Sequence, residues 1–215
     1  MERNIVESAL EFVKKFFEGE ASGHDYYHTY RVFKIAQNMA KNNKIADCEI
    51  CELGALLHDV DDIKISPTTY ENKDNARNFL LENNYPIDKI DFICKIIDDV
   101  SFRGKDSVKP QTIEGMIVQD ADRLEAIGAI GIARTFAYGG SHGREIYNPD
   151  IKPVLNQSKE QYHKSNSPTI NHFYEKLLLL KDMMNTEEGK KIAEQRTQYM
   201  KEYLDEFFAE WNGER

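Results

Sequence analysis

Four side chains of the sequence have the chemistry to hold a divalent metal ion. His58 and Asp59 are adjacent at the end of an apolar run, and His28 and Asp122 lie far from them in the chain. Neutral imidazoles and carboxylates are ligands that first-row divalent ions take in proteins. The alternative is that the histidines are hydrogen-bonded core residues and the aspartates are solvated. A metal site therefore requires elements that bring the four together.

Both histidines are predicted to point inward from helices. Residues 26–42 predict a helix that Asp25 caps, and His28 falls on the apolar face of that helix. Residues 47–58 predict the next helix, capped by Asp47, in which His58 is the last member of the core-facing stripe. Two inward histidines at matching ends of successive helices favour a shared site.

Asp122 belongs to a long predicted helix, residues 112–136, that is rich in alanine and glycine. Small residues let neighbouring helices approach closely, so we expect this helix at the centre of the fold. A carboxylate in a central helix is partly buried and must be paired, hydrogen-bonded or bound to a metal. The alternative is a solvated stripe on the open side of the helix.

The remaining elements are also predicted to be helical, and no segment shows the alternation of a strand. The other predicted helices cover residues 5–17, 66–83, 86–100, 168–184 and 187–211. Residues 137–166 contain several Gly and Pro and almost no periodicity, which predicts an irregular loop near the site. The expected fold is all-α, a helical bundle that forms one domain over residues 1–215.

Composition narrows the class of protein. The 215 residues are 40% hydrophobic and 30% charged, which is typical of a soluble globular protein. The net charge of -9 and the lack of a Lys/Arg block argue against binding to duplex nucleic acid, but a local basic pocket for a small phosphorylated ligand is compatible with them. There is no signal-peptide pattern and no apolar run near the ~18 residues of a membrane span. The chain has an odd number of cysteines, Cys48, Cys51 and Cys94, which indicates free thiols. Free thiols are typical of a reducing compartment, so we expect a cytoplasmic protein.

A histidine, a His-Asp pair on the next helix and a distant aspartate on a central helix form the pattern of the HD-domain metal-dependent phosphohydrolases, which the chain resembles. The segments around His28, His58 and Asp122 are most similar to a bacterial branch with YedJ-like and YpgQ-like proteins. The segments that carry this resemblance are Gly23-His-Asp-Tyr-Tyr-His28-Thr-Tyr-Arg31, His58-Asp-Val-Asp-Asp62-Ile-Lys64, Asp120-Ala-Asp122-Arg-Leu-Glu and His172-Phe-Tyr-Glu.

The resemblance implies one divalent ion bound by His28, His58, Asp59 and Asp122. Manganese, magnesium, cobalt, nickel and iron all suit such ligands, so the sequence leaves the metal open. Residues 60–121 contain no histidine, which favours one metal over the two-metal site of some HD phosphodiesterases.

The resemblance also implies roles on the substrate side. Similar enzymes carry an acidic residue three positions after the His-Asp aspartate, so Asp62 is the candidate that orients or deprotonates the attacking water, ahead of Asp61. The candidate contacts to substrate phosphates are Lys64, Arg31, His24 and Lys105.

The functional hypothesis is a hydrolase that uses metal-activated water on nucleotides, with release of pyrophosphate from a (deoxy)nucleoside triphosphate. Two alternatives stay open, a nucleoside monophosphate phosphatase and a non-catalytic HD module that senses a nucleotide or a metal. The expected partner is a small phosphorylated substrate, while the oligomeric state and the base preference are left open.

Overall fold

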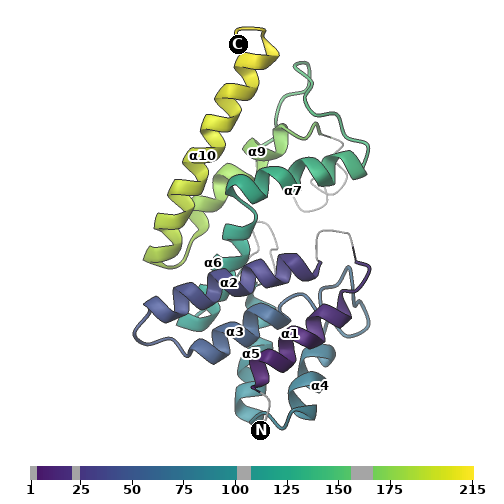
Figure 1. Cartoon of the computed structure of the whole chain (residues 1–215), viewed down its shortest axis with the longest axis vertical. Coiled ribbons are helices and arrows are strands. Elements are labelled where there is room, and N and C mark those ends of the chain that lie inside the picture. Colours follow the sequence, from purple (N-terminus) through teal and green to yellow (C-terminus); the bar gives the residue numbers. More distant parts are fainter. Residues whose placement is uncertain (1–3, 21–24, 101–107, 156–166) are drawn as a thin grey trace. The chain divides into compact units, whose positions relative to one another are not determined.

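The computed structural model describes residues 4–20, 25–100, 108–155 and 167–215, and every regular element in these ranges is a helix. This confirms the all-α fold. The elements are α1 (Ile5–Phe16), α2 (Tyr26–Asn42), α3 (Cys48–Leu57), α4 (Asp74–Glu82), α5 (Ile87–Val100), α6 (Ile113–Glu125), α7 (Gly128–Ser141), α9 (Asn171–Glu175), the 3-10 helix η2 (Leu177–Met183) and α10 (Glu187–Trp211) (Figure 1). None of the described helices is both long and apolar enough to cross a bilayer.

The chain divides into two compact units, of which unit 1 extends to Asp122 and unit 2 begins at Arg123. In unit 1, α3 packs against α1, α2 and α5, and α4 packs against α5. In unit 2, α10 packs against α7 (Figure 1). It also packs against η2, which α9 contacts as well. A single domain over residues 1–215 stays a prediction.

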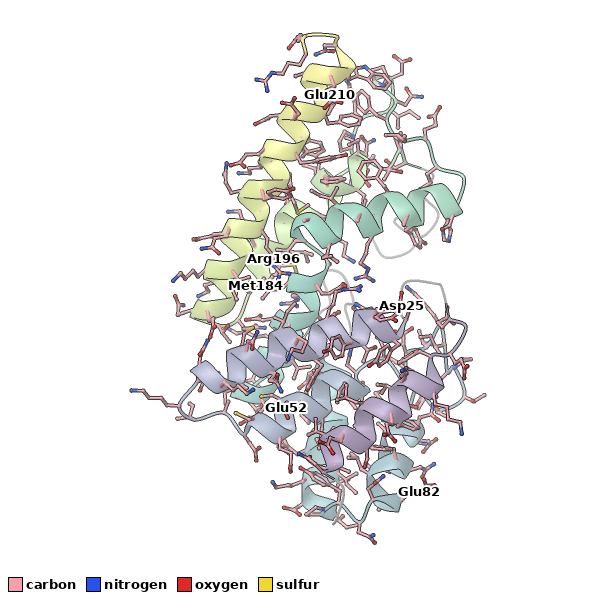
Figure 2. The ribbon with its side chains drawn as sticks, viewed as in Figure 1. Asp25, Glu52, Glu82, Met184, Arg196 and Glu210 are labelled. Carbon is pink, nitrogen blue, oxygen red and sulfur yellow. The ribbon has the colours of Figure 1, made fainter. Side chains whose placement is uncertain are left out.

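The helices of unit 1 that matter for the site begin where the sequence predicts. The carboxylate of Asp25, labelled in Figure 2, accepts a hydrogen bond of 2.7 Å from the backbone N–H of His28. Asp47 caps α3 in the same way, through the N–H groups of Glu49 and Ile50. Each cap satisfies backbone donors that a helix leaves without partners in its first turn.

Gly54 allows α3 to lie close to its neighbours. A Cβ atom at this position would come within 3.3 Å of Ile96 on α5 and 3.4 Å of Val118 on α6. Larger residues would push these helices apart. The small residue therefore holds the end of α3, which carries His58, near the helix that carries Asp122.

The predicted helix 66–83 is wrong in its first half. Residues 65–73 form turns, Lys73 adopts a left-handed conformation (φ 57°), and α4 starts only at Asp74. The cap of α4 comes from outside the segment, because the buried carboxylate of Asp61 accepts hydrogen bonds from the N–H groups of Asn75 (3.1 Å) and Ala76 (2.9 Å).

The predicted single helix 112–136 is also wrong, because the chain breaks between α6 and α7. Ile127 is extended and Gly128 has a φ of +80°, which only glycine adopts without strain. A Cβ atom on Gly128 would lie 3.1 Å from Cγ of Arg196 on α10. Helix α7 then continues to Ser141, so the irregular segment that we expected from residue 137 begins at 142.

The C-terminal helices are partly as predicted. The segment 168–184 is not one helix but α9 followed by the 3-10 helix η2. Helix α10 agrees with its prediction, and the hydroxyl of Thr186 caps it through the N–H of Gly189 (2.9 Å).

Candidate metal centre

Three helices of unit 1 bring the four predicted ligands together. His28 is on α2, His58 and Asp59 directly follow α3, and Asp122 is near the end of α6. The residues His28, His58 and Asp59 are only 3%, 6% and 6% exposed, whereas the side chain of Asp122 is 26% exposed. Three of the four residues are therefore buried, and the carboxylate of Asp122 is the part of the cluster that solvent reaches most.

The donor atoms of these side chains converge. Nε2 of His28 lies 3.3 Å from Nε2 of His58. Oδ2 of Asp59 is 3.2 Å from the first nitrogen and 3.3 Å from the second. Oδ1 of Asp122 is 3.5 Å and 3.8 Å from the same two nitrogens.

These separations fit one first-row divalent ion. Ligand bonds of roughly 2.0–2.2 Å place adjacent donor atoms about 2.8–3.1 Å apart in octahedral geometry and about 3.3–3.6 Å apart in tetrahedral geometry. Only the separation between His58 and Asp122, 3.8 Å, is slightly wider than these values. Nδ1–H of His58 donates to the carbonyl of Ala55 (2.8 Å), so its Nε2 carries the lone pair that faces the cluster. His28, His58 and Asp59 form a group whose donor atoms all lie within 4.8 Å of one another and could hold a metal ion. Asp122 adds a second carboxylate beside the two imidazoles.

The electrostatics of His58 agree with a site for a cation. Burial by itself lowers the pKa of this imidazole, but the negative charges of Asp59 and Asp122 outweigh burial, and the net pKa is raised above 6.5. The two carboxylates thus favour a positive charge beside Nε2 of His58, whether that charge is a proton or a metal ion. A proton and a metal ion would compete for the same nitrogen.

The neighbouring aspartates have different environments. Asp61 is 1% exposed, and both of its carboxylate oxygens are used in capping α4. Asp62 is half-buried, and one of its oxygens accepts the N–H of Lys64 (2.9 Å). Its other oxygen accepts no hydrogen bond from the residues that the structure describes. Asp62 is therefore the more available base of the two.

The candidate phosphate contacts are placed only in part. Lys64 is exposed, and its ammonium forms no ion pair within the described ranges. Arg31 is half-buried on α2, one turn from His28. His24 and Lys105 lie outside the described residues, so the structure says nothing of them.

Asn75 holds the turn beside the candidate ligands, a role that the sequence did not reveal. Its side-chain amide donates to the carbonyl of Val60 (2.9 Å) and to the hydroxyl of Thr69 (3.0 Å). The first bond ties α4 to the turn that carries Asp59 and Asp62, and the second ties it to the turns that precede α4. No local motif marks such a residue, because its partners lie up to 15 positions away.

Comparison with known proteins identifies the family of the chain. The HD domain model matches residues 25–127, a span that includes all four candidate ligands. YpgQ of Bacillus subtilis (strain 168), a protein described as uncharacterized, is 36% identical over 195 residues, which are 90% of this chain and 87% of YpgQ. The chain belongs to the HD-domain family.

Solved structures of this family have the same fold over almost the whole chain. A protein of Lactobacillus plantarum superposes with a TM-score of 0.82 at 36% identity, covering 97% of each chain. An HD-superfamily hydrolase of Bacillus thuringiensis gives 0.77 at 40% identity and 96% of each chain. Bacillus subtilis YpgQ in complex with ADP gives 0.75 at 33% identity, covering 94% of this chain and 93% of YpgQ. The chain is thus an HD-superfamily hydrolase of the YpgQ-like branch, within a class of metal-dependent phosphohydrolases.

Proposed function

We propose that this HD hydrolase cleaves a phosphoanhydride bond of nucleotides and releases pyrophosphate from a (deoxy)nucleoside triphosphate. The observation that carries the proposal is the convergence of His28, His58, Asp59 and Asp122 at separations of 3.2–3.8 Å. The crystal structure of YpgQ with ADP supports a nucleotide as the ligand class, because YpgQ is related over nearly the full chain.

In this proposal the four side chains hold one divalent ion, and manganese, magnesium, cobalt, nickel and iron are all candidates. When bound, the ion supplies an acidified water and polarises the phosphoryl group. Burial of His28 and His58 excludes bulk water from the inner side of the cluster, which strengthens its interactions with charge.

Asp62 and Lys64 perform the remaining steps. One carboxylate oxygen of Asp62 accepts no hydrogen bond from the described residues, and it can receive the proton of the attacking water. The ammonium of Lys64 is exposed and can offset negative charge on the departing phosphates. The backbone bond from Lys64 N–H to Asp62 fixes the two residues relative to each other (2.9 Å).

The decisive experiment is a screen of nucleoside mono-, di- and triphosphates with metal-free protein supplemented with one metal at a time. We expect pyrophosphate as the product from triphosphates. Asp62→Asn should lower kcat by about 10²–10⁴-fold, while Asp91→Asn, an exposed carboxylate on α5, should leave it unchanged.

The products and variants separate the alternatives. Free phosphate from monophosphates would assign a phosphatase, and tight nucleotide binding without turnover would assign a sensor. An absence of turnover with every metal, or full activity of Asp62→Asn, would contradict the proposal.

A further inference from the structure

Unit 2 contains a small cavity that the proposed phosphate chemistry does not use. Its volume is about 190 Å³, and it lies between residues 147–153, α9 and α10. Rings and apolar side chains form most of its wall, namely Tyr147, Pro149, Pro153, Ile170, Tyr174 and Phe208. Pockets for drug-sized ligands are usually about 300–1,000 Å³. The cavity therefore has room for one planar ring system and not for a complete nucleotide.

Contacts between aromatic rings hold this wall in place. Tyr147 meets Phe208 edge-on, with ring centroids 5.2 Å apart, and meets Trp211 edge-on at 4.9 Å. Such perpendicular contacts fix the rings relative to one another. A planar ligand would thus meet aromatic surfaces that are already oriented.

Asn171 adds one polar group to the wall. It is 1% exposed, and its amide nitrogen donates to the carbonyl of Ile151 (2.9 Å). That bond fixes the orientation of the side chain, and Oδ1 accepts no hydrogen bond from the described part of the chain. A buried acceptor of this kind is satisfied by a ligand that donates an N–H group.

These features select one class of ligand. A lipid chain would leave the oxygen of Asn171 without a donor, and an anion would meet that oxygen unfavourably. A nucleobase offers a flat π-surface for the rings together with N–H donors at its edge. Lys152, exposed at the rim, can contact a phosphate attached to the base through its sugar.

We propose that this cavity binds the base of a nucleoside or nucleotide. The inference goes beyond the proposed function, because the cavity is a separate binding site, and it rests on that function only for the choice of nucleotides as the ligand class. The cavity residues themselves all belong to unit 2 and none is a candidate metal ligand. Base binding can therefore be measured without metal and without phosphate.

The test is titration of the full chain with adenosine in the presence of a chelator. Trp211 is the sole tryptophan of the sequence and contacts Tyr147, so its fluorescence reports on the cavity. We expect saturable quenching and a matching heat in calorimetry. Tyr174→Ala should weaken binding by about tenfold or more through the loss of stacking, and Tyr199→Ala, an exposed aromatic on α10 outside the cavity, should not.

The role of Asn171 is tested from the ligand side. Purine riboside lacks the amino group of adenosine, so it should bind the wild-type chain about tenfold more weakly, as expected for the loss of one hydrogen bond to a buried group. The two ligands should bind Asn171→Leu equally. If adenosine and purine riboside bound the wild-type chain equally, the assignment of Asn171 would be overturned. This comparison uses the wild-type protein alone, so it does not depend on the folding of a variant.

The two proposals fail in different ways. Absence of adenosine binding in a protein that hydrolyses nucleotides would overturn the base pocket and leave the proposed function intact. Adenosine binding without metal-dependent turnover would overturn the proposed function and leave the base pocket intact. Displacement of adenosine by a proline-rich peptide of higher affinity would overturn the base assignment and identify the cavity as a peptide site.

Discussion

Replacement of Asp122 by Asn tests the metal centre with little change of shape. Oδ1 of Asp122 lies 3.5 Å and 3.8 Å from the two Nε2 atoms, and the side chain is 26% exposed. Asparagine can occupy the same space but brings no negative charge. The substitution should therefore affect the affinity for a cation and leave the packing of α6 unchanged.

The size of the effect follows from linkage. Loss of groups that only support metal ligands weakens binding by about 10–100-fold, and a direct ligand belongs at the upper end. At free manganese about 1,000 times the wild-type Kd, binding stabilises the folded protein by about 4.1 kcal/mol. A 100-fold weaker site gains only about 1.4 kcal/mol under the same conditions. The difference of about 2.7 kcal/mol corresponds to roughly 5–11 °C in Tm for a chain of this length.

The assay is thermal unfolding of both proteins with chelator and with manganese. With chelator, the difference in Tm between Asp122→Asn and the wild type gives the effect of the lost charge on the histidines, and only the additional rise with manganese reports on the metal. Asp91→Asn, whose carboxylate pairs with Arg77 away from the cluster, should keep the full metal-dependent rise in Tm. An equal rise in Asp122→Asn would refute the assignment of Asp122 as a ligand.

Three further substitutions probe the structure around the site and in unit 2. Asp61→Ala removes the carboxylate that caps α4 and leaves two N–H groups without a partner, so the free energy of unfolding in urea should fall by about 2–3 kcal/mol. Gly128→Ala places an alanine in a left-handed conformation against Arg196 and should lower the free energy of unfolding in urea by about 2 kcal/mol. An unchanged free energy of unfolding would show that the fold does not require glycine at the break between α6 and α7. Burial, followed by the charges of Lys176 and Arg144, lowers the pKa of His172 to about 3, so this imidazole is neutral in the folded protein and protonated in the unfolded chain below pH 6.5. Acid therefore favours unfolding, and His172→Gln should reduce the loss of stability between pH 8 and pH 5 by about 1–2 kcal/mol.

Local signals in the sequence were sufficient for the helices that carry the histidines. Helix α2 was predicted with its observed bounds because Asp25 caps it and its apolar face is regular. Helix α3 was predicted within one residue at each end, from Asp47 and a continuous stripe. The inward direction of His28 and His58 followed from the same periodicity, since helical spacing fixes which side chains share a face.

Tertiary contacts decided the elements that were predicted wrongly. The small residues around Gly128 predict one closely packed central helix. The structure instead has a break between α6 and α7 at Gly128, where Arg196, labelled in Figure 2, packs against the glycine backbone. Ser66 and Pro67 have the pattern of a helix start, yet α4 begins at Asp74, next to the carboxylate of Asp61. In both cases the partner is distant in sequence, so a local pattern cannot specify it.

The pair Asp61 and Asp62 shows why residue type alone does not assign a role. The two side chains are identical and adjacent, and both follow the His-Asp pair within one turn. The fold buries the first at the start of α4, where its charge is offset by backbone N–H groups and a helix N-terminus. The second accepts a hydrogen bond from the backbone N–H of Lys64, and its other carboxylate oxygen has no donor among the residues that the structure describes. Loss of Asp61 should therefore act through stability and loss of Asp62 through catalysis, because the same chemistry is used for structure in one environment and is available for reaction in the other.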